Sequence, residues 1–563
     1  MGELFMPTPQ LHHHVNGDTP ATFALRDQPM HANRHMKVIG VGAGASGLCL
    51  AYKLKHYFTD FTLNIYEKND DVGGTWFENR YPGCACDIPA ATEIFKYFAN
   101  FADTYGLRDY ISCNHKVTGA VWDEGAKEWN VIIQKPEGSE FTQSCDFLIN
   151  ASGVLNNWRW PAVSGLETFK GPLLHSAAWD ENVDLTGKRV GLIGNGLHLA
   201  RIASHVTTFF RSPTWISPTK GMEYHEYTEE ERAAFRNVPG KHLQMRKATE
   251  KATAADTFPL LITGSASNLA AERYMREQMK LKLRNDELAS RLLPKFPVGC
   301  RRFTPGVGYL ETLSKDSVTV IFDEVVKLTP TSCITRNNTE VELDALICAT
   351  GFDTSFKPRF SIIGRGGKDL REEWADEPRS YLSIAAHGYP NYYMFLGPNS
   401  PVGNGPFIVA METAADYIAQ LMNRWQKEDV TSFDLKPEAV NDFIQQKDAA
   451  LSRTVWASDC PYWYKDRRTG RIIALWPGST LHYMEALAQP RYEDYYITYR
   501  SGNRFAYFGN GFSQTELCPY IDPVAYIRDK DDGVPISRRL QLEGTWNAKS
   551  IGNVLGIVKK PAI

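Results

Sequence analysis

The chain has 563 residues, a formal net charge of -3 and 43% hydrophobic residues, and this length predicts two or three domains with packed cores. A charge so close to zero excludes bulk attraction to nucleic acid or to an anionic membrane, and no run approaches the ~20 apolar residues of a spanning helix. Ten cysteines lack the spacing of a disulfide framework and the N-terminus lacks a secretory signal pattern, which together predict a cytoplasmic protein that acts on small molecules.

The first clear element is a strand over residues 37–41 that runs into a glycine-rich turn and a helix over residues 48–54. The turn reads G-x-G-x-x-G, which allows a tight bend, close backbone approach to a pyrophosphate and close packing of the helix on the strand. The next strand, residues 62–66, ends in an acidic residue about 20 positions after the turn, where a carboxylate accepts hydrogen bonds from ribose hydroxyls. The residues predicted to bind a dinucleotide here are Gly42, Gly44, Ser46, Gly47 and Glu67.

A second glycine-rich string covers residues 73–89 and reads G-G-T-W-F-E-N-R-Y-P-G-C-A-C-D-I-P. Its glycines permit close backbone approach to a planar ring. The C-x-C pair within it, Cys84 and Cys86, has no second cysteine cluster to complete a metal site. We therefore predict no metal, and we find no metal-ligand cluster elsewhere in the sequence.

Alternating residues over 117–122 and 129–134 predict a small antiparallel insertion. Residues 169–180 then read F-x-G-x-x-x-H-x-x-x-W-D. His175 and Trp179 are four positions apart, so they could share one face of a short helical turn. A lone histidine or tryptophan is usually structural, but the joint spacing favours a role in coupling two domains.

The strings at residues 73–89 and 169–180 resemble those of the type I Baeyer-Villiger monooxygenases, class B flavoenzymes that use NADPH and dioxygen to insert oxygen beside a ketone carbonyl. The resemblance runs from about residue 36 to 485 and implies an α/β fold with two dinucleotide-binding, Rossmann-like domains, one for FAD and one for NADPH. It implies that Asp87 holds an active-site arginine in place, with a helix cap or turn as the alternative role. The implied flavin contacts in the first string are Gly74, Thr75, Trp76, Tyr81 and Asp87.

Residues 188–196 repeat the strand-into-glycine design and predict a second dinucleotide domain, because a flavin and a nicotinamide need one each. The glycines of this turn are Gly194 and Gly196. After the following strand, the resemblance places Arg211, with Ser212 beside it, at the 2′-phosphate of NADPH. A guanidinium suits that task because it grips phosphate through two hydrogen bonds; a surface arginine is the alternative.

Residues from about 225 to 295 are charged and helix-prone, which predicts a helical insertion in the nicotinamide domain with its charge runs facing solvent. Residues 300–311 then resemble the family segment that carries the catalytic arginine. The resemblance gives that role to Arg302 and gives contact with the NADPH phosphate to Arg301. Residues 344–353 resemble the turn that returns the chain to the flavin domain.

These observations predict four regions of the chain. The N-terminal region has a composition typical of a segment with little structure of its own, and the last region has a mixed secondary structure. The regions are an extension over 1–35, the first part of the FAD domain over 36–165, the NADPH domain over 166–345, and the rest of the FAD domain with the C-terminal part over 346–563.

Two segments are shorter than the family pattern. About 20 residues that family members carry after the position of Pro89 are missing, which exceeds ordinary loop variation. In the second glycine turn Leu199 stands where a third glycine is expected, and the helix that follows has room for two turns at most. The chain is then an active flavoenzyme with these segments, a flavin-binding protein that has lost monooxygenation, or the product of a gene-model error.

The activity that the resemblance implies is a Baeyer-Villiger oxidation. FAD accepts hydride from NADPH and reacts with dioxygen to give a C4a-peroxyflavin, which converts a ketone into an ester or a lactone. Arg302, steered by Asp87, would supply positive charge where negative charge develops. The expected partners are a small ketone and dioxygen, with no nucleic acid and no membrane; oxygenation of nitrogen or sulfur is the alternative within related flavin monooxygenases.

Overall fold

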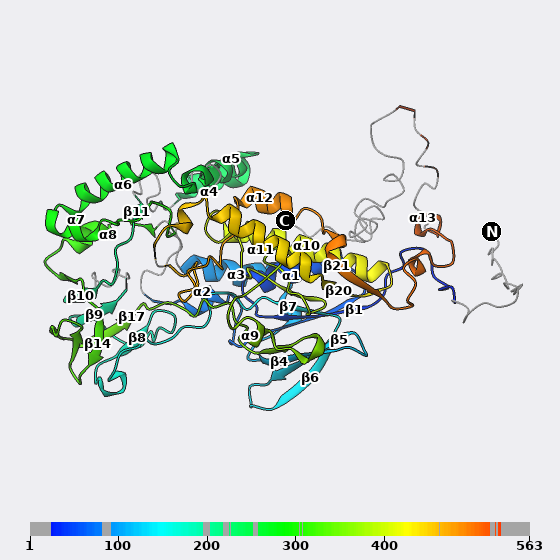
Figure 1. The fold of residues 1–563 in the computed structure, drawn as a ribbon, viewed down its shortest axis with the longest axis horizontal. Coiled ribbons are helices and arrows are strands. Elements are labelled where there is room, and N and C mark those ends of the chain that lie inside the picture. Colours follow the sequence, from blue (N-terminus) through cyan, green and yellow to red (C-terminus); the bar gives the residue numbers. More distant parts are fainter. Residues whose placement is uncertain are drawn as a thin grey trace, which may run out of the picture.

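Two parallel five-stranded sheets organise the chain, one for each glycine-rich turn found in the sequence (Figure 1). The computed structural model describes residues 24–81, 92–194, 203–217, 225, 227–251, 257–302, 304–306, 308–460, 462–517, 524, 527 and 529–530. Each sheet has helices on one face and antiparallel strands on the other, so the predicted α/β class with two Rossmann-like units is confirmed.

The first sheet has the strand order β19-β7-β1-β2-β3, and all neighbouring strands are parallel. Its strands are β1 (Met36–Val41), β2 (Phe61–Tyr66), β3 (Ile111–Ser112), β7 (Phe147–Asn150) and β19 (Tyr392–Met394). Successive side chains of β1 point to opposite faces. Val38 packs with the helices α1 (Ala45–Tyr57) and α10 (Phe407–Lys427), whereas Ile39 packs against the antiparallel strands. This alternation buries both faces of the sheet.

The antiparallel strands on the far face confirm the predicted insertion. Together with β18, which pairs in parallel with β4, they form a four-stranded sheet in the order β18-β4-β5-β6, which lies below the first sheet in Figure 1. Its strands are β4 (Lys116–Asp123), β5 (Glu128–Gln134), β6 (Glu140–Cys145) and β18 (Ser361–Ile363). Trp129 of β5 is buried and donates its indole N–H to the carbonyl of Pro390 at 2.7 Å, which anchors the insertion to the flavin-side core.

The second sheet repeats the plan with the parallel order β13-β10-β9-β17-β8. Its strands are β8 (Leu173–His175), β9 (Arg189–Ile193), β10 (His205–Phe209), β13 (Val318–Ile321) and β17 (Ala345–Cys348), so β17 runs past the expected boundary at residue 345. One face packs on α6 (Ala266–Leu283), α7 (Asp286–Leu292) and α8 (Tyr309–Leu313). The other packs on the antiparallel strands β14 (Val325–Leu328), β15 (Ser332–Thr335) and β16 (Glu340–Glu342).

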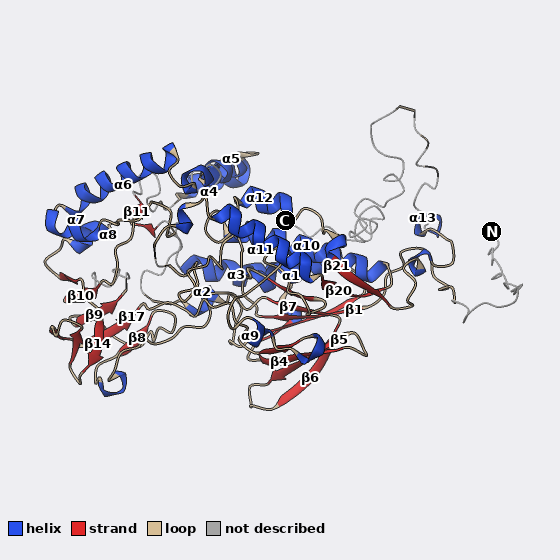
Figure 2. Cartoon of the chain, viewed as in Figure 1, coloured by secondary structure: helices blue, strands red, loops and turns tan. Residues whose placement is uncertain are grey.

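Helices fill the predicted insertion between β10 and β13. Besides α6 and α7 it contains α4 (Glu229–Asn237) and α5 (Lys241–Glu250) (Figure 2). The hydroxyl of Thr228 accepts the backbone N–H of Glu231, and the carboxylate of Glu231 accepts the backbone N–H of Thr228, which together form a capping box at the start of α4. The remaining named elements are α2 (Thr75–Glu78), α3 (Thr92–Thr104), α9 (Leu370–Glu373), α11 (Pro437–Leu451), α12 (Thr480–Ala486), α13 (Gln514–Leu517), β11 (Ile216–Ser217), β12 (Thr304–Pro305), β20 (Val430–Leu435) and β21 (Tyr495–Tyr499). Within the described ranges, every helix is too short or too polar to cross a bilayer.

The part of the predicted extension that the structure describes, residues 24–35, lies against the C-terminal part of the chain. The backbone N–H of Met30 donates to the carbonyl of Phe512 at 2.8 Å. The guanidinium of Arg34 stacks on the indole of Trp425, with its carbon 3.4 Å from the ring centroid, and donates a hydrogen bond to the carbonyl of Val430. The segment therefore has no regular secondary structure but does have a fixed place.

Candidate active site

The first glycine turn joins β1 to α1 and has no room for side chains. Gly42 has φ 99°, and a Cβ there would lie 2.9 Å from the carbonyl oxygen of Ala151. A Cβ on Gly47 would overlap the carbonyl oxygen of Gly42. Gly44 is the N-cap of α1 and makes no side-chain capping bond, so the first N–H groups of the helix are available to an anionic ligand. Ser46 directs its hydroxyl to the sulfur of Met411 in α10, at 2.8 Å, and so ties α1 to α10.

Glu67 closes the other side of this turn. It stands directly after β2, is 4% exposed, and accepts the backbone N–H of Ala43 at 2.7 Å and that of Asn69 at 2.9 Å. Burial raises the pKa of its carboxyl group, while these two backbone donors lower it. Each carboxylate oxygen keeps a further lone pair, which suits a ribose hydroxyl donor. The sequence prediction for Glu67 thus has a fitting geometry, with the added role of bracing the glycine turn.

The second glycine-rich string meets the first turn backbone to backbone. Gly74 has φ 52°, and a Cβ there would lie 2.9 Å from the Cα of Gly44. The N–H of Gly73 donates to the carbonyl of Ala43 at 3.0 Å. The two glycine-rich segments therefore touch backbone to backbone, and the absence of side chains at both positions permits close approach of a flavin dinucleotide to the backbone.

The remaining residues predicted in this string fall in different places. Thr75 is exposed and Trp76 half-buried, both in α2, and Trp76 packs against the core of the first sheet. Tyr81 is half-buried at the end of the described stretch. Asp87 and the shortened segment after Pro89 lie outside the described residues, so the role of Asp87 stays a prediction.

The second glycine turn begins in the same way as the first. Gly194 follows β9 with φ 121°, and a Cβ there would lie 2.7 Å from the carbonyl oxygen of Ala349. Its own carbonyl accepts the hydroxyl of Thr208 at 3.2 Å. Gly196 and Leu199 lie outside the described residues. The start of the turn is therefore as crowded as in the first unit, and both starts need glycine.

Positive charge gathers after β10, the strand that corresponds to β2. The guanidinium of Arg301 donates to the hydroxyl of Ser212 and to the carbonyl of Pro213, both at 3.0 Å. Burial lowers the pKa of Arg301, and the positive charge of Arg211 lowers it further. Two guanidinium groups and a hydroxyl at the carboxyl edge of a parallel sheet form a site for a doubly charged anion such as a phosphate.

Arg302 reaches from the half of the molecule built on the second sheet to the half built on the first sheet. Its guanidinium donates to the carbonyl of Val402 at 2.8 Å and lies 4.9 Å from the ring centroid of Phe407, the first residue of α10. Val402 belongs to the loop before α10 and is buried, as is Ser400, whose hydroxyl has no hydrogen-bond partner among the described residues. Two consecutive arginines thus contact opposite halves of the chain.

His175 lies where the two connections between the sheets cross. It is 0% exposed, and its ring stacks on Trp158 at 4.6 Å between centroids. Its Nδ1 accepts the backbone N–H of Ala177 at 3.1 Å, so the neutral ring carries its proton on Nε2, 3.2 Å from the hydroxyl of Thr350. That hydroxyl in turn donates to the carbonyl of Arg159. His175 therefore ties together the outgoing and the returning connection.

The predicted helical turn around His175 is wrong. Residues 173–175 are strand β8, which pairs in parallel with β17, and a turn follows. Trp179 is half-buried and packs on the core of the second sheet. Pairing with β17 overrides the four-residue spacing, because a strand edge buries more backbone hydrogen bonds than one isolated helical turn. The sequence also missed Trp158 and Trp160, although two tryptophans shortly before the fingerprint are a usable signal.

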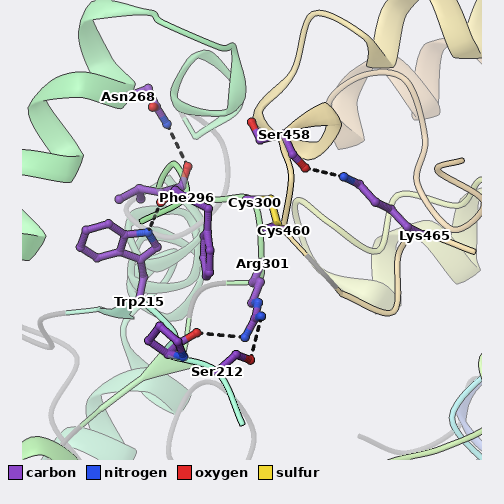
Figure 3. The surroundings of a disulfide bond; sticks show 11 residues. Ser212, Trp215, Asn268, Phe296, Cys300, Arg301, Ser458, Cys460 and Lys465 are labelled. Carbon is purple, nitrogen blue, oxygen red and sulfur yellow. Dashed lines mark hydrogen bonds between the residues drawn. A yellow bond between two sulfur atoms is a disulfide. The ribbon is translucent and has the colours of Figure 1, made fainter. Parts of the chain in front are cut away.

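The sequence reasoning also missed a disulfide. Cys300, next to Arg301, is bonded to Cys460, across a sequence separation of 160 residues. Figure 3 shows the bond between the segment that carries Arg301 and the segment of Ser458 and Lys465. No short-range cysteine pattern marks this pair, because the two residues meet only through the fold.

Comparison with known proteins gives a consistent set of similarities. The family model for NAD(P)-binding Rossmann-like domains matches residues 41–105, and that for flavin-binding monooxygenase-like proteins matches residues 77–222. The chain is 34% identical to the FAD-binding monooxygenase moxY of Dothistroma septosporum, over 92% of each chain. It is 29% identical to a Baeyer-Villiger monooxygenase of Pseudomonas aeruginosa, over 85% of this chain and 94% of the other. Among solved structures, an oxidized steroid monooxygenase bound to NADP is similar with a TM-score of 0.72 and 26% identity, over 83% of this chain and 100% of that one.

Proposed function

Because this chain belongs to the FAD-binding monooxygenases, we propose that it performs a Baeyer-Villiger oxidation, in which one oxygen atom of O2 is inserted beside a ketone carbonyl to give an ester or a lactone. FAD and NADPH are its cofactors. When bound, they supply the transfer of electrons from NADPH to dioxygen and the activated oxygen that attacks the ketone. The observation that carries the proposal is the position of Arg302, which extends from the NADPH half to the loop in front of α10 in the FAD half.

The chain's residues bind FAD through backbone more than through side chains. The turn of Gly42, Gly44 and Gly47 presents N–H groups to the pyrophosphate, and Glu67 accepts the ribose hydroxyls. Gly74 packs backbone to backbone against Gly44, so neither turn can carry a side chain at this contact. This bare backbone supports the assignment.

Arg211, Ser212 and Arg301 bind the 2′-phosphate of NADPH. A phosphate monoester carries nearly two negative charges, and two guanidinium groups can neutralise it with several hydrogen bonds. The existing bond from Arg301 to Ser212 at 3.0 Å orients the guanidinium toward the edge of the second sheet in advance. This arrangement favours NADPH over NADH, which lacks the phosphate.

Arg302 holds a positive charge at the place where the ketone oxygen becomes negative. Its guanidinium is fixed by the carbonyl of Val402 and by the ring of Phe407 before any substrate arrives. Donors that are fixed in advance stabilise developing charge by a few kcal/mol, because they need no reorganisation during the reaction. The assignment of Asp87 as the residue that steers Arg302 is part of the same proposal.

Apolar side chains exclude water around Arg302. Val402 packs in a buried cluster with Trp456 and Leu475, and the partly buried ring of Phe407 joins its edge. Exclusion of water strengthens the field of the guanidinium and protects activated oxygen from protonation. An apolar ketone therefore suits the surroundings of Arg302 better than a polar one.

The test is product analysis with purified protein, FAD, NADPH and a panel of ketones of increasing size. We expect oxidation of NADPH that depends on the ketone. We also expect one molecule of ester or lactone, identified by mass spectrometry, for each molecule of NADPH oxidised. Hydroxylamines or sulfoxides as the only products would contradict the proposal and indicate oxygenation of nitrogen or sulfur. A yellow protein that does not oxidise NADPH would indicate a flavin-binding protein without monooxygenation.

A further inference from the structure

The bond between Cys300 and Cys460 lies at the position where the two halves share the arginine pair. Cys300 directly precedes Arg301 and Arg302 in the chain, and the Cα atoms of the bonded cysteines are 6.6 Å apart. Both cysteines are buried, with exposed fractions of 1% and 2%. The bond is thus inside the contact between the halves.

The Cys300 side of the bond is anchored in the NADPH half (Figure 3). Asn268 of α6 donates to the carbonyl of Val298 at 2.9 Å, and the indole of Trp215 donates to the carbonyl of Phe296 at 2.9 Å. The guanidinium carbon of Arg301 lies 4.8 Å from the ring centroid of Phe296. These contacts fix the backbone on the N-terminal side of Arg301.

The Cys460 side belongs to the FAD half. Its backbone N–H donates to the carbonyl of Ser458 at 2.8 Å, and Trp456 just before it is buried with Val402 and Leu475. The ring centroid of Tyr462, just after Cys460, lies 5.9 Å from the guanidinium carbon of Arg301. The disulfide therefore holds the segment that carries Tyr462, in the FAD half, against Arg301.

We propose that the disulfide between Cys300 and Cys460 is a redox-sensitive positioning element that holds Arg301 in the geometry needed to bind the 2′-phosphate of NADPH. This inference rests on the proposed function, which supplies the phosphate. With the bond closed, Arg301 stays between Phe296 and Tyr462 with its donors on Ser212 and Pro213. With the bond open, the segment is free to separate from the Tyr462 side, so the fraction of molecules with Arg301 in place falls and the apparent affinity for NADPH falls in proportion.

Opening and closing follow ordinary thiol–disulfide exchange. A dithiol reductant supplies two electrons and two protons; the sulfur–sulfur bond of the protein breaks to two thiols, and the reductant closes into its own disulfide. Oxidised glutathione reverses the step, because the two protein thiols each give up a proton and an electron while two molecules of glutathione are released. Because both cysteines are buried, exchange requires a local opening that exposes a sulfur to the reductant.

The first experiment establishes the bond in the FAD-loaded full chain. The protein is incubated with oxidised glutathione, alkylated under denaturing conditions and digested, and the peptides are identified by mass spectrometry with and without reductant. We expect a linked peptide that contains Cys300 and Cys460, which disappears on reduction. Alkylated, unlinked Cys300 and Cys460 after the oxidising incubation would overturn the inference.

The second experiment measures what the bond does to nucleotide binding. Calorimetry gives the Kd of NADP+ and of NAD+ for the FAD-loaded wild type, for the wild type reduced with a dithiol, and for Cys300→Ser and Cys460→Ser. We expect the Kd of NADP+ to rise about tenfold when the bond is absent, the effect of one weakened charge-assisted contact, while that of NAD+ changes less than about twofold. Cys113→Ser, a partly exposed thiol beyond β3, is the matched control and should bind like the wild type.

Each outcome of the second experiment decides the inference. Equal binding of NADP+ by the open and closed forms would overturn it, and so would a parallel loss for NADP+ and NAD+, which indicates a purely structural bond. If a serine variant does not fold, the reduced wild type gives the same readout. A wild type that binds NADP+ with the expected dependence on the bond but forms no ester would contradict the proposed function and leave the positioning role standing.

Discussion

The two parallel sheets have the same plan but place opposite charges after corresponding strands. In the first sheet β2 ends at the buried carboxylate of Glu67, whereas in the second sheet β10 is followed by Arg211, with Arg301 beside it. A carboxylate accepts hydrogen bonds from free ribose hydroxyls and repels a 2′-phosphate, and a guanidinium does the reverse. In the proposed function, the charge after this strand therefore distinguishes the dinucleotide that each half binds.

The largest effect is expected where the two halves meet. Arg302→Ala removes the guanidinium that reaches Val402 from the NADPH half, so kcat for ester formation should fall about 10²- to 10³-fold, the usual effect of losing a fixed donor to developing charge. FAD content and the Kd of NADP+ should change less than about twofold, because neither nucleotide site loses a contact. Steady-state kinetics and calorimetry measure both, and Arg504→Ala, an exposed arginine, is the control. An unchanged kcat would remove Arg302 from the reaction.

A matched pair of glycine variants separates the two turns. Gly42 and Gly194 both have positive φ, and a Cβ on either would meet a carbonyl oxygen, at 2.9 Å and 2.7 Å respectively. Such strain costs about 1–3 kcal/mol, or roughly ten- to a hundredfold in affinity. Gly42→Ala should therefore purify with little flavin absorbance, while Gly194→Ala should keep its FAD and bind NADP+ more weakly. Loss of FAD in both variants would mean that the turns do not act independently.

The charge after β10 can be tested through nucleotide preference. Arg211→Ala should lower the ratio of kcat/KM for NADPH over NADH by about tenfold, because one charge-assisted contact to the 2′-phosphate is lost. NADH kinetics serve as the internal control and should stay near those of the wild type. An equal loss for both nucleotides would assign Arg211 to packing rather than to phosphate binding.

The smallest effect concerns the crossing between the halves. Burial lowers the pKa of His175 below its usual value of 6.5. Just below pH 6.5 this histidine is therefore protonated in the unfolded chain but still neutral in the folded chain. The stability that this histidine contributes is complete above pH 6.5 and is lost as the pH falls below it. His175→Gln should therefore lose less stability than the wild type as the pH falls from about 7 to 5, measured by urea unfolding at each pH.

A second histidine supplies a control for the effect of His175→Gln on activity. Burial also lowers the pKa of His31, which lies outside both sheets in the N-terminal segment. His31→Gln should change the same pH dependence but leave monooxygenation unaffected, whereas His175→Gln should also slow turnover because it loosens the tie to Thr350. Identical activity of the two variants would remove His175 from domain coupling.

The elements that were predicted correctly from the sequence are those marked by local patterns. Both glycine turns, the antiparallel insertion and the helical insertion follow from spacing, periodicity and composition, because these elements are specified by neighbouring residues. The position of Glu67 could also be predicted, since a strand of fixed length places its end at a known distance from the turn. A functional residue whose position depends only on the local succession of strand, turn and helix can thus be predicted from the sequence.

Long-range pairing accounts for what the sequence did not predict. The strand at His175 forms because β17 lies beside it, and the disulfide forms because residues 160 positions apart meet in the fold. Arg302 was assigned by resemblance, but its contact with Val402 joins residues from different halves and has no local signature. Such contacts depend on the placement of whole units, which no short pattern specifies.

The adjacent arginines set a limit on how this segment can evolve. Arg301 donates its hydrogen bonds within the NADPH half and Arg302 donates to the FAD half, so the order of the two residues in the chain matters as much as their identity. Inserting one residue between Cys300 and Arg301 would shift each guanidinium by one position and present them to the wrong partners. A single substitution here removes one contact, whereas a change of length displaces both guanidinium groups at once.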